Sequence, residues 1–325
     1  MKYRQTVLIV GSTGNIGSPT VLNLGKNHPD IQVKALVRPG AKVPETWNEF
    51  DNVQVVRCDL NDHAKVDQVV QGCDRIALIT RNSNTQKEQE LAVIEAARKH
   101  KVGFLAKISA YKHIVYEDSP VYCFRDHHAI LKVLTKQTEL DYAIVSPCFA
   151  YANHFMLSIP ALKNGSPVKT PWPVDLKLPV QDGRDVADLL AKIMVTDNLA
   201  PYSKQHLELF GHHYSMSEMV QALGMAMGIP EAKCEQCTRE EYQAILEASQ
   251  LPTGLAEMIS YIMTENVRLA ESLQAGSVEE TEKLIGHPVK DFPTFLRDFG
   301  LVEASEVRLE KFNRDNNHIP SCVQK

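Results

Sequence analysis

The feature that most constrains the fold is an apolar stretch that runs into three glycines. Residues 7–24 read VLIVGSTGNIGSPTVLNL, in which four apolar residues precede a G-x-x-G-x-x-G turn. A buried strand, a glycine turn and a helix form the first βα unit of a dinucleotide-binding domain, where backbone N–H groups and the helix N-terminus face the pyrophosphate. Glycine permits the tight left-handed turn and keeps Cβ atoms away from the ligand. The turn residues predicted to contact the cofactor are Gly11, Thr13, Gly14, Asn15, Ile16 and Gly17.

The rest of the first half supplies the context that this motif needs, since glycine turns between strands and helices are common on their own. Short apolar, β-branched runs alternate with segments of helical period at 86–100 and 126–137. This alternation is typical of βαβ units and of a parallel sheet covered on both faces. We therefore predict an α/β fold with a doubly wound, parallel Rossmann-type sheet. The expected strands cover residues 7–10, 33–37, 53–57, 75–80, 103–109 and 142–146.

The pattern changes after about residue 150. Five prolines within residues 160–179 predict loops and edge strands rather than central strands. A short strand is expected at 206–210, and Ser215 with Glu218 matches the capping box that opens a helix. The predicted parts are a dinucleotide-binding domain at 1–155, a smaller, mostly helical domain at 156–300 that can be interleaved with the first, and a surface tail at 301–325.

The end of the second strand distinguishes the two pyridine dinucleotides. NAD-binding domains carry an acidic residue there, which bonds to the ribose 2′-hydroxyl. This chain has Arg38 instead, followed by Lys42. A guanidinium offers planar donors that suit a 2′-phosphate, so NADP(H) is the expected cofactor. The alternative is that Arg38 is a solvated loop charge.

Later strand ends are expected to complete the cofactor site, because ligands of such sheets bind at the carboxyl ends of the strands. Asp59 ends the third strand and either accepts a bond from the adenine amino group or caps the next helix. The further predicted cofactor contacts are Asp59, Leu60, Thr80, Arg81, Asn82, Ser109 and Pro147.

Charge and hydropathy exclude several classes of protein. The chain has 325 residues and a formal net charge of −5, whereas non-specific nucleic-acid binding needs a basic face. No apolar run approaches the roughly 18 residues that span a bilayer, and MKYRQTVLIVG leads directly into the first strand without a secretory signal. We expect a cytoplasmic protein that binds neither nucleic acid nor membrane directly.

The seven cysteines, an odd number, favour reduced thiols over a disulfide framework. Cys234 and Cys237 form a single CxxC. A structural zinc site needs about four ligands, and no second pair stands nearby in the sequence. His212 and His213 would complete a site only if the chain folded back. We therefore predict no metal.

Several segments together resemble the NmrA-like group of atypical short-chain dehydrogenases/reductases, over about residues 5–255. The resemblance implies a Rossmann domain with a small C-terminal domain and NADP(H) as cofactor. Some members reduce quinones or other carbonyl-type acceptors, whereas others bind the nucleotide as redox sensors or transcriptional co-regulators. The segments that carry the resemblance are VLIVGSTGNIG, ALVR, VVRCDL, FLAKISA, HHAILKVLTKQTELDYAIVSPCFAYANHF, LPVQDGRDVADLLAKIM and REEYQAILEASQLP.

The proton donor of most short-chain dehydrogenases, Tyr-x-x-x-Lys, is missing. Tyr111, Tyr116 and Tyr122 are followed four residues later by valine, proline and aspartate. Ser109, at the end of the fifth predicted strand, stands where short-chain enzymes orient a substrate carbonyl, although it could merely close the strand. Tyr111 could face the nicotinamide or be an ordinary loop residue.

A histidine pair opens the next predicted helix at the place where the family carries a histidine. The resemblance implies His127 as the residue that faces the ligand, with His128 toward solvent; the alternative is a helix-start histidine bonded to backbone. A neutral imidazole could donate to the carboxamide or to a quinone oxygen, and its pKa suits proton transfer near neutrality. Lys132 stands near a position where the family often has a glutamate, so no acid role is carried over to it.

The segment PCFAYANHF follows the sixth predicted strand and should line the nicotinamide end. Phe149, Tyr151 and Asn153 would give aromatic walls with a polar contact for a small flat acceptor, or else belong to the core. Cys148 raises the idea of a thiol sensor, which would need a depressed pKa.

Three functions follow from these observations. The first is an NADPH-dependent oxidoreductase for a quinone-like or other carbonyl acceptor, since a quinone can dispense with a strong general acid. The second is a non-catalytic NADP(H) sensor that presents its C-terminal half to a regulatory protein partner. The third, a sugar-nucleotide epimerase or lyase, is disfavoured because such chemistry normally keeps Tyr-x-x-x-Lys. The oligomeric state stays open.

Overall fold

The computed structural model describes most of the chain: residues 3–150, 158–249, 251 and 253–298. Within these residues a seven-stranded sheet runs in the order β10-β6-β5-β4-β1-β2-β3, and every pairing in it is parallel. Its strands are β1 (Gln5–Val10), β2 (Ile31–Val37), β3 (Val53–Arg57), β4 (Arg75–Leu78), β5 (Phe104–Ile108), β6 (Tyr142–Pro147) and β10 (Gln205–Leu209). The predicted α/β fold with a doubly wound parallel sheet is confirmed, and each of the six expected strands is present.

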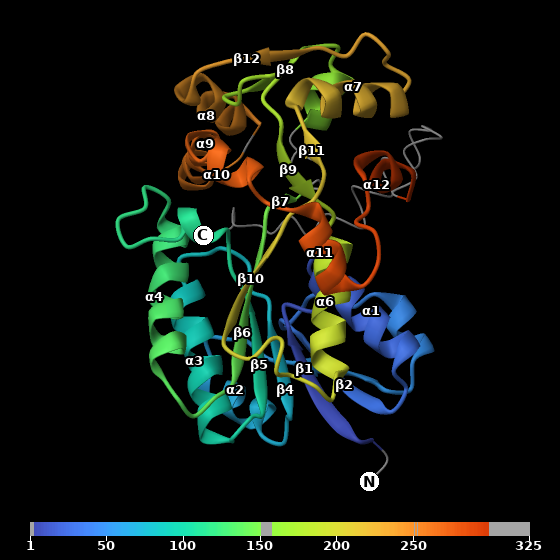
Figure 1. Ribbon diagram of the computed structural model, residues 1–325, viewed down its shortest axis with the longest axis vertical. Helices are drawn as coiled ribbons and strands as arrows, with labels where there is room; N and C mark the ends of the chain where they lie inside the picture. Colours follow the sequence, from blue (N-terminus) through green and yellow to red (C-terminus); the bar gives the residue numbers. More distant parts are fainter. Residues whose placement is uncertain (1–2, 151–157, 250, 252, 299–325) are drawn as a thin grey trace.

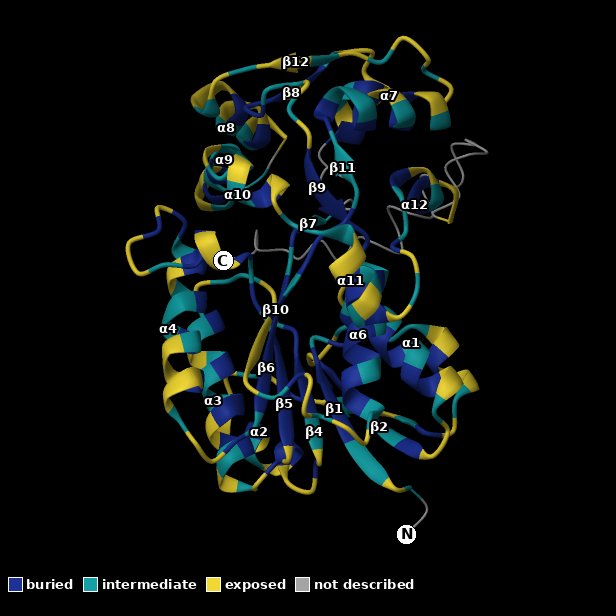
Figure 2. Ribbon diagram, in the orientation of Figure 1, coloured by how far each residue is buried: buried dark blue, intermediate teal, exposed yellow. Residues whose placement is uncertain are grey.

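Helices cover both faces of this sheet, as Figure 1 shows. The strands alternate their side chains between the faces: Val7 and Ile9 join one core cluster, whereas Leu8 and Val10 join the other. One layer contains α1 (Gly17–Asn27) and α6 (Gly183–Val195), and the opposite layer contains α2 (His63–Val70), α3 (Gln86–Lys99) and α4 (Tyr122–Lys136). In Figure 2 the strands are largely buried and the outer faces of these helices are exposed.

The second half of the chain contributes to the large sheet as well. The strand expected at 206–210 is β10, which adds a seventh strand beside β6 because Leu207 and Leu209 point into the core. Helix α6 packs beside α1 on the same sheet face. The boundary predicted at residue 155 falls outside the described residues, and so does the predicted tail at 301–325.

Most of the remaining elements form a smaller body above the carboxyl edge of the sheet (Figure 1), whereas α11 (Val278–Ile285) packs on α6 and β10 and joins the core of the large sheet. Helix α7 begins with the predicted capping box, in which the Ser215 hydroxyl accepts from the Glu218 N–H and the Glu218 carboxylate accepts from the Ser215 N–H. Two small sheets accompany the helices, in the orders β11-β9-β7 and β12-β8. The elements are β7 (Phe149–Ala150), β8 (Val168–Thr170), β9 (Leu178–Gln181), β11 (His213–Tyr214), β12 (Cys234–Gln236), α7 (Met216–Ala226), α8 (Arg239–Ala248), α9 (Thr253–Arg268), α10 (Ala270–Gln274), α11 (Val278–Ile285) and α12 (Phe292–Asp298).

None of the helices in the described ranges is long and apolar enough to cross a membrane.

Candidate functional site

The glycine turn joins β1 to α1 at the carboxyl edge of the large sheet. Gly11 has a φ of +75°, and a Cβ there would collide with the backbone oxygen of Ile79 at the end of β4. A Cβ on Gly17 would collide with the backbone of Gly11. The turn is closed by the Gly14 N–H, which donates to the Gly11 carbonyl at 3.0 Å. These contacts show why the turn needs glycine at its first and last positions.

The first turn of α1 suits an anion. Its N-cap residue, Ile16, has no side-chain oxygen to accept from the helix N–H groups, and no acidic residue lies in the first turn. The Ser18 N–H donates to the Gly14 carbonyl at 2.9 Å, but no side chain caps this turn, and its N–H groups together with the positive end of the helix dipole favour a negatively charged ligand. Gly14 and Asn15 are exposed and Gly11, Thr13 and Ile16 are half-buried, so these predicted contact residues reach the surface of this edge, whereas Gly17 is buried.

Arg38 follows β2 and is exposed, as a residue that meets a 2′-phosphate must be. The sequence reasoning missed its neighbour Arg57. The Nη1 of Arg57 donates to the carbonyls of Arg38 and Ala41, at 3.3 and 3.1 Å, and so holds the turn that carries Arg38. The parallel register, in which Val37 pairs with Arg57, could have revealed this second cation at the predicted phosphate site.

Asp59 lies one residue beyond Cys58, after β3, and is exposed. Its carboxylate accepts from the Asn61 N–H at 3.0 Å, while the cap of α2 is Asp62, which accepts from the Lys65 N–H at 3.0 Å. The helix-cap interpretation therefore belongs to Asp62, and the adenine contact of Asp59 stays a prediction. Leu60 beside it is half-buried.

Thr80 follows β4 and belongs to a buried polar network. Its hydroxyl donates to the Oε1 of Glu90 in α3, which also accepts from the Gln86 Nε2 at 2.9 Å. Glu90 Oε2 lies 2.7 Å from the Lys107 Nζ in β5. Arg81 is exposed and Asn82 half-buried, on the loop toward α3. The network thus connects a predicted cofactor contact to the interior of the sheet edge.

His127, the predicted ligand-facing histidine, lies in the same network and is only 5% exposed. Its Nδ1 is 3.0 Å from the Lys107 Nζ, and its Nε2 is 3.4 Å from the Gln86 Nε2. Burial, followed by the positive charge of Lys107, lowers the pKa of His127 well below its usual range. His128 is half-buried. The structure thus surrounds His127 with protein groups, and its contact with a ligand stays a prediction.

A depressed histidine pKa makes stability depend on pH. Between the native pKa of His127 and about 6.5 the unfolded chain binds a proton that the native state excludes, so stability falls as pH falls through this window. The buried charges facing His127 are Lys107 and Glu90. Glutamine does not titrate, so His127→Gln should remove this proton uptake on unfolding. We expect the slope of the unfolding free energy against pH to become shallower by up to about 1.4 kcal/mol per pH unit in this window. Urea unfolding between pH 4.5 and 7.5 measures both slopes; parallel curves would contradict a neutral native His127.

Ser109 follows β5 and is 5% exposed. Its N–H donates to the Val145 carbonyl at 2.8 Å, whereas its Oγ has no hydrogen-bond partner among the described residues. Tyr111 is buried, its hydroxyl donates to the Ser272 carbonyl at 2.9 Å, and burial raises its pKa to about 12. Ser109 is therefore available to a ligand, while the Tyr111 hydroxyl is bonded to α10.

The residues around the end of β6 are partly described. Pro147 ends the strand, and Phe149, half-buried in β7, meets Trp172 edge to face. Burial raises the pKa of Cys148 to about 12, so its thiol is a poor nucleophile and does not suit a thiol sensor. The predicted pocket residues Tyr151 and Asn153 lie outside the described residues.

Gln181 is a further buried group that the sequence reasoning missed. It ends β9, is 1% exposed, and its Oε1 lies 4.0 Å from the Cys148 Sγ. Its Nε2 meets no acceptor within the described part of the chain. A buried amide donor without a partner is unfavourable by about 1–3 kcal/mol, which makes it a candidate ligand contact. Its signal in the sequence, one glutamine after an apolar strand, was too weak to single it out.

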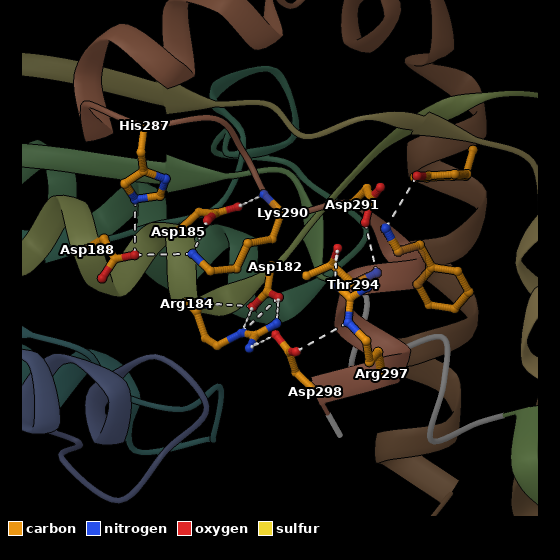
Figure 3. A network of polar contacts seen from close by, with 12 residues as sticks. Asp182, Arg184, Asp185, Asp188, His287, Lys290, Asp291, Thr294, Arg297 and Asp298 are labelled. Atoms are coloured by element: carbon orange, nitrogen blue, oxygen red, sulfur yellow. Dashed lines mark hydrogen bonds and ion pairs between the residues drawn. The ribbon is translucent and has the colours of Figure 1, made fainter. Parts of the chain in front are cut away.

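Helix α6 begins beside the glycine turn. The two backbones are so close that a Cβ on Gly183 would lie 3.3 Å from the Asn15 carbonyl oxygen. Asp182 caps this helix and pairs with Arg184, which also reaches Asp298 at 2.7 Å (Figure 3). The network continues through Lys290, whose Nζ lies 2.8 Å from Asp185. These contacts fasten the segment 287–298 to the helix that adjoins the turn.

Asp185, Asp188 and His287 bring three potential metal ligands together. The Lys290 ammonium already lies among them, 3.3 Å from Asp188, and the His287 Nε2 lies 3.1 Å from the same carboxylate (Figure 3). A cation supplied by the chain therefore satisfies this cluster.

Cys234 and Cys237 do not form a redox pair in this structure. Cys234 begins strand β12, and residues three apart in an extended strand have Cα atoms about 10 Å apart. A disulfide needs Cα atoms closer than about 7 Å. Both thiols are half-buried, and burial raises the pKa of Cys234 to about 12.

The sequence matches the family described as the NmrA-like family over residues 3–294. The protein quinone oxidoreductase 2 of Escherichia coli (strain K12) is 24% identical over 285 residues, which are 87% of this chain and 94% of that protein. The family match spans more than half of the chain and therefore establishes membership.

Solved structures share the fold at low identity. The NADPH complex of the Escherichia coli NADPH-dependent quinone oxidoreductase has a TM-score of 0.76 and 22% identity, covering 90% of this chain and 99% of that one. The NADP(H) complex of a Citrobacter sp. triphenylmethane reductase has a TM-score of 0.73 at 18% identity, with 90% and 99% covered. The negative transcriptional regulator NmrA, in complex with NAD, has a TM-score of 0.72 at 15% identity, with 96% and 98% covered. This chain, with its glycine turn at the carboxyl edge of a doubly wound sheet, belongs to the NmrA-like family.

Proposed function

We propose that this protein is an NADPH-dependent oxidoreductase that transfers a hydride to a quinone-like or other flat carbonyl acceptor. The observation that carries the proposal is the turn at 11–17, where a glycine backbone and an uncapped, acid-free helix N-terminus fit a pyrophosphate. Membership of the NmrA-like family supports it, as do relatives whose solved complexes hold NADPH or NADP(H).

The turn after β2 favours NADPH over NADH. Arg38 is exposed there, and Arg57 holds the turn through two carbonyls, so two guanidiniums stand where an NAD-specific domain has a carboxylate. A 2′-phosphate would meet both positive charge and planar hydrogen-bond donors at this place.

Arg38→Asp tests this choice. We expect the Kd for NADPH to rise about 10- to 100-fold, since a hydrogen bond to a charged group contributes about 1.5–3 kcal/mol. Binding of NADH should change little, because NADH has no 2′-phosphate to repel. Titration calorimetry with both nucleotides measures the ratio, with Lys101→Asp, the same charge change at an exposed lysine, as control. An equal loss for both nucleotides would show that the phosphate lies elsewhere.

The acceptor side needs hydrogen-bond donors more than a strong acid. When bound, the reduced nicotinamide supplies the hydride. Ser109 Oγ and Gln181 Nε2 are buried and without partners in the described structure, so they can donate to an oxygen of the acceptor or of the carboxamide. A quinone that accepts hydride becomes a stabilised hydroquinone anion, whose proton can come from water. The missing Tyr-x-x-x-Lys is compatible with that chemistry.

The test mixes purified protein with NADPH and a panel of quinones and follows absorbance of the reduced nicotinamide. Turnover above the uncatalysed background supports the proposal. Micromolar nucleotide binding without turnover on any quinone would favour the second candidate, a nucleotide sensor with a protein partner. One observation favours that alternative: the only histidine of the predicted site in the described residues, His127, is buried among protein groups.

A further inference from the structure

A charge pair that the proposed chemistry does not use lies inside the sheet edge. Lys107 and Glu90 are both 0% exposed, with Nζ and Oε2 2.7 Å apart. Removing two charges from water is unfavourable, and apolar residues often fill such a place with equal or better stability. The pair therefore calls for an explanation other than stability.

The Lys107 Nζ has three close polar neighbours. It donates to the Ile108 carbonyl at 2.7 Å, lies 3.0 Å from His127 Nδ1, and forms an ion pair with Glu90 Oε2 at 2.7 Å. Because a lysine ammonium only donates, the His127 Nδ1 must accept and carry no proton. The proton of a neutral ring then resides on Nε2.

We propose that Lys107 is a positioning residue, which holds His127 in the neutral Nε2–H tautomer so that His127 donates a hydrogen bond and supplies no proton to the reaction. Burial lowers the pKa of Lys107, whereas the Glu90 carboxylate opposes that shift and favours the charged ammonium. Glu90 also accepts from the Thr80 hydroxyl. One bonded series thus fixes a predicted cofactor contact at one end and the predicted site histidine at the other.

His127 meets Gln86 at its other ring nitrogen. Its Nε2 lies 3.4 Å from the Gln86 side-chain amide, whose Oε1 has no partner among the described residues. The Gln86 Nε2 donates to Glu90 Oε1 at 2.9 Å, so in the Nε2–H tautomer its 3.4 Å approach to His127 Nε2 is a contact between two donors and not a hydrogen bond. The other charges near this end of α4 are Arg125, Asp126 and, facing Asp126 from α3, Lys87 and Glu88.

The first experiment reads the tautomer directly, by ¹⁵N NMR of the ligand-free protein with His127→Gln as the assignment reference. At pH 7 the expected spectrum shows an unprotonated Nδ1 and a protonated Nε2, unchanged on acidification to about pH 5.5. Lys107→Met should produce a mixed tautomer or an imidazolium near neutrality, because the donor is gone and the Glu90 carboxylate remains. Lys107→Arg should retain the wild-type pattern. The control is Lys136→Met, which changes an exposed lysine on α4, the helix that carries His127. An Nδ1–H tautomer in the wild-type protein overturns the inference even if Lys107→Met does not fold.

The second experiment rests on the proposed reductase function. Wild-type kcat with NADPH and an active quinone should show no inflection near pH 6.5, and Lys107→Met should introduce one. An inflection in the wild-type profile that disappears in His127→Gln would make His127 the proton source and overturn the inference. Absence of quinone turnover would remove the proposed function and leave the tautomer result to decide the role of Lys107.

Discussion

Gly11→Ala is expected to abolish NADPH binding and to destabilise the fold by on the order of 4 kcal/mol, because the added methyl group would overlap the Ile79 carbonyl oxygen. The backbone there cannot move away without separating β1 from β4 or opening the turn. Its φ of +75° adds about 1–2 kcal/mol of strain for a residue with a Cβ. Urea unfolding and titration calorimetry measure the two effects.

Gly72→Ala is the matched control for this change. Gly72 has nearly the same φ, +74°, but a Cβ there would meet nothing within 4 Å. It should therefore show the conformational strain alone, about 1–2 kcal/mol, with NADPH binding unchanged. If the two variants lost the same stability, the close approach of the glycine turn to β4 would not be responsible, and the fit of the turn to a pyrophosphate would lose its main support.

The second large effect is expected from separating the buried charges. Lys107→Met leaves the Glu90 carboxylate in a fully buried place without its cation, which should destabilise the protein by about 3–5 kcal/mol. Adding Glu90→Gln to Lys107→Met should restore a large part of that loss, because no unpaired charge remains. The unfolding free energies of the wild type, Lys107→Met, Glu90→Gln and the double variant form a double-mutant cycle. Their coupling energy measures how strongly the two side chains interact.

The surface pair of Lys132 and Glu117, 3.6 Å apart and exposed, offers the comparison. Breaking it should change stability little, since water screens exposed charges. Additive effects of the Lys107 and Glu90 substitutions would mean that the two side chains are not coupled, and would also weaken the proposed role of Lys107.

Much of the fold could be predicted because its signals are local. Each of the first six strands is a short run of apolar or β-branched residues with a helical segment after it, and such periodicity depends on neighbours in the chain. The capping box at Ser215 and Glu218 is similarly local, since both residues belong to one turn. The place of β10 was harder to predict, because a five-residue strand with polar residues at three positions does not indicate which strand it will pair with.

The candidate site likewise contains residues that the sequence could predict and residues that it could not. The turn at 11–17 and the cation at Arg38 could be identified because strand, turn and helix follow one another directly. Lys107, in contrast, is one polar residue within the apolar run FLAKI, and nothing beside it in the sequence suggests a partner. Arg57 and Gln181 were missed for the same reason.

Local patterns were enough to predict the parallel sheet, the glycine turn and the charge that would meet a 2′-phosphate, because turn geometry and side-chain period depend on neighbouring residues. The packing of α3 and α4 on the same sheet face, by which Glu90 and His127 meet around Lys107, became visible only in the folded chain. These contacts join residues 17 and 20 positions apart, and packing of the layers, rather than any local pattern, brings them together.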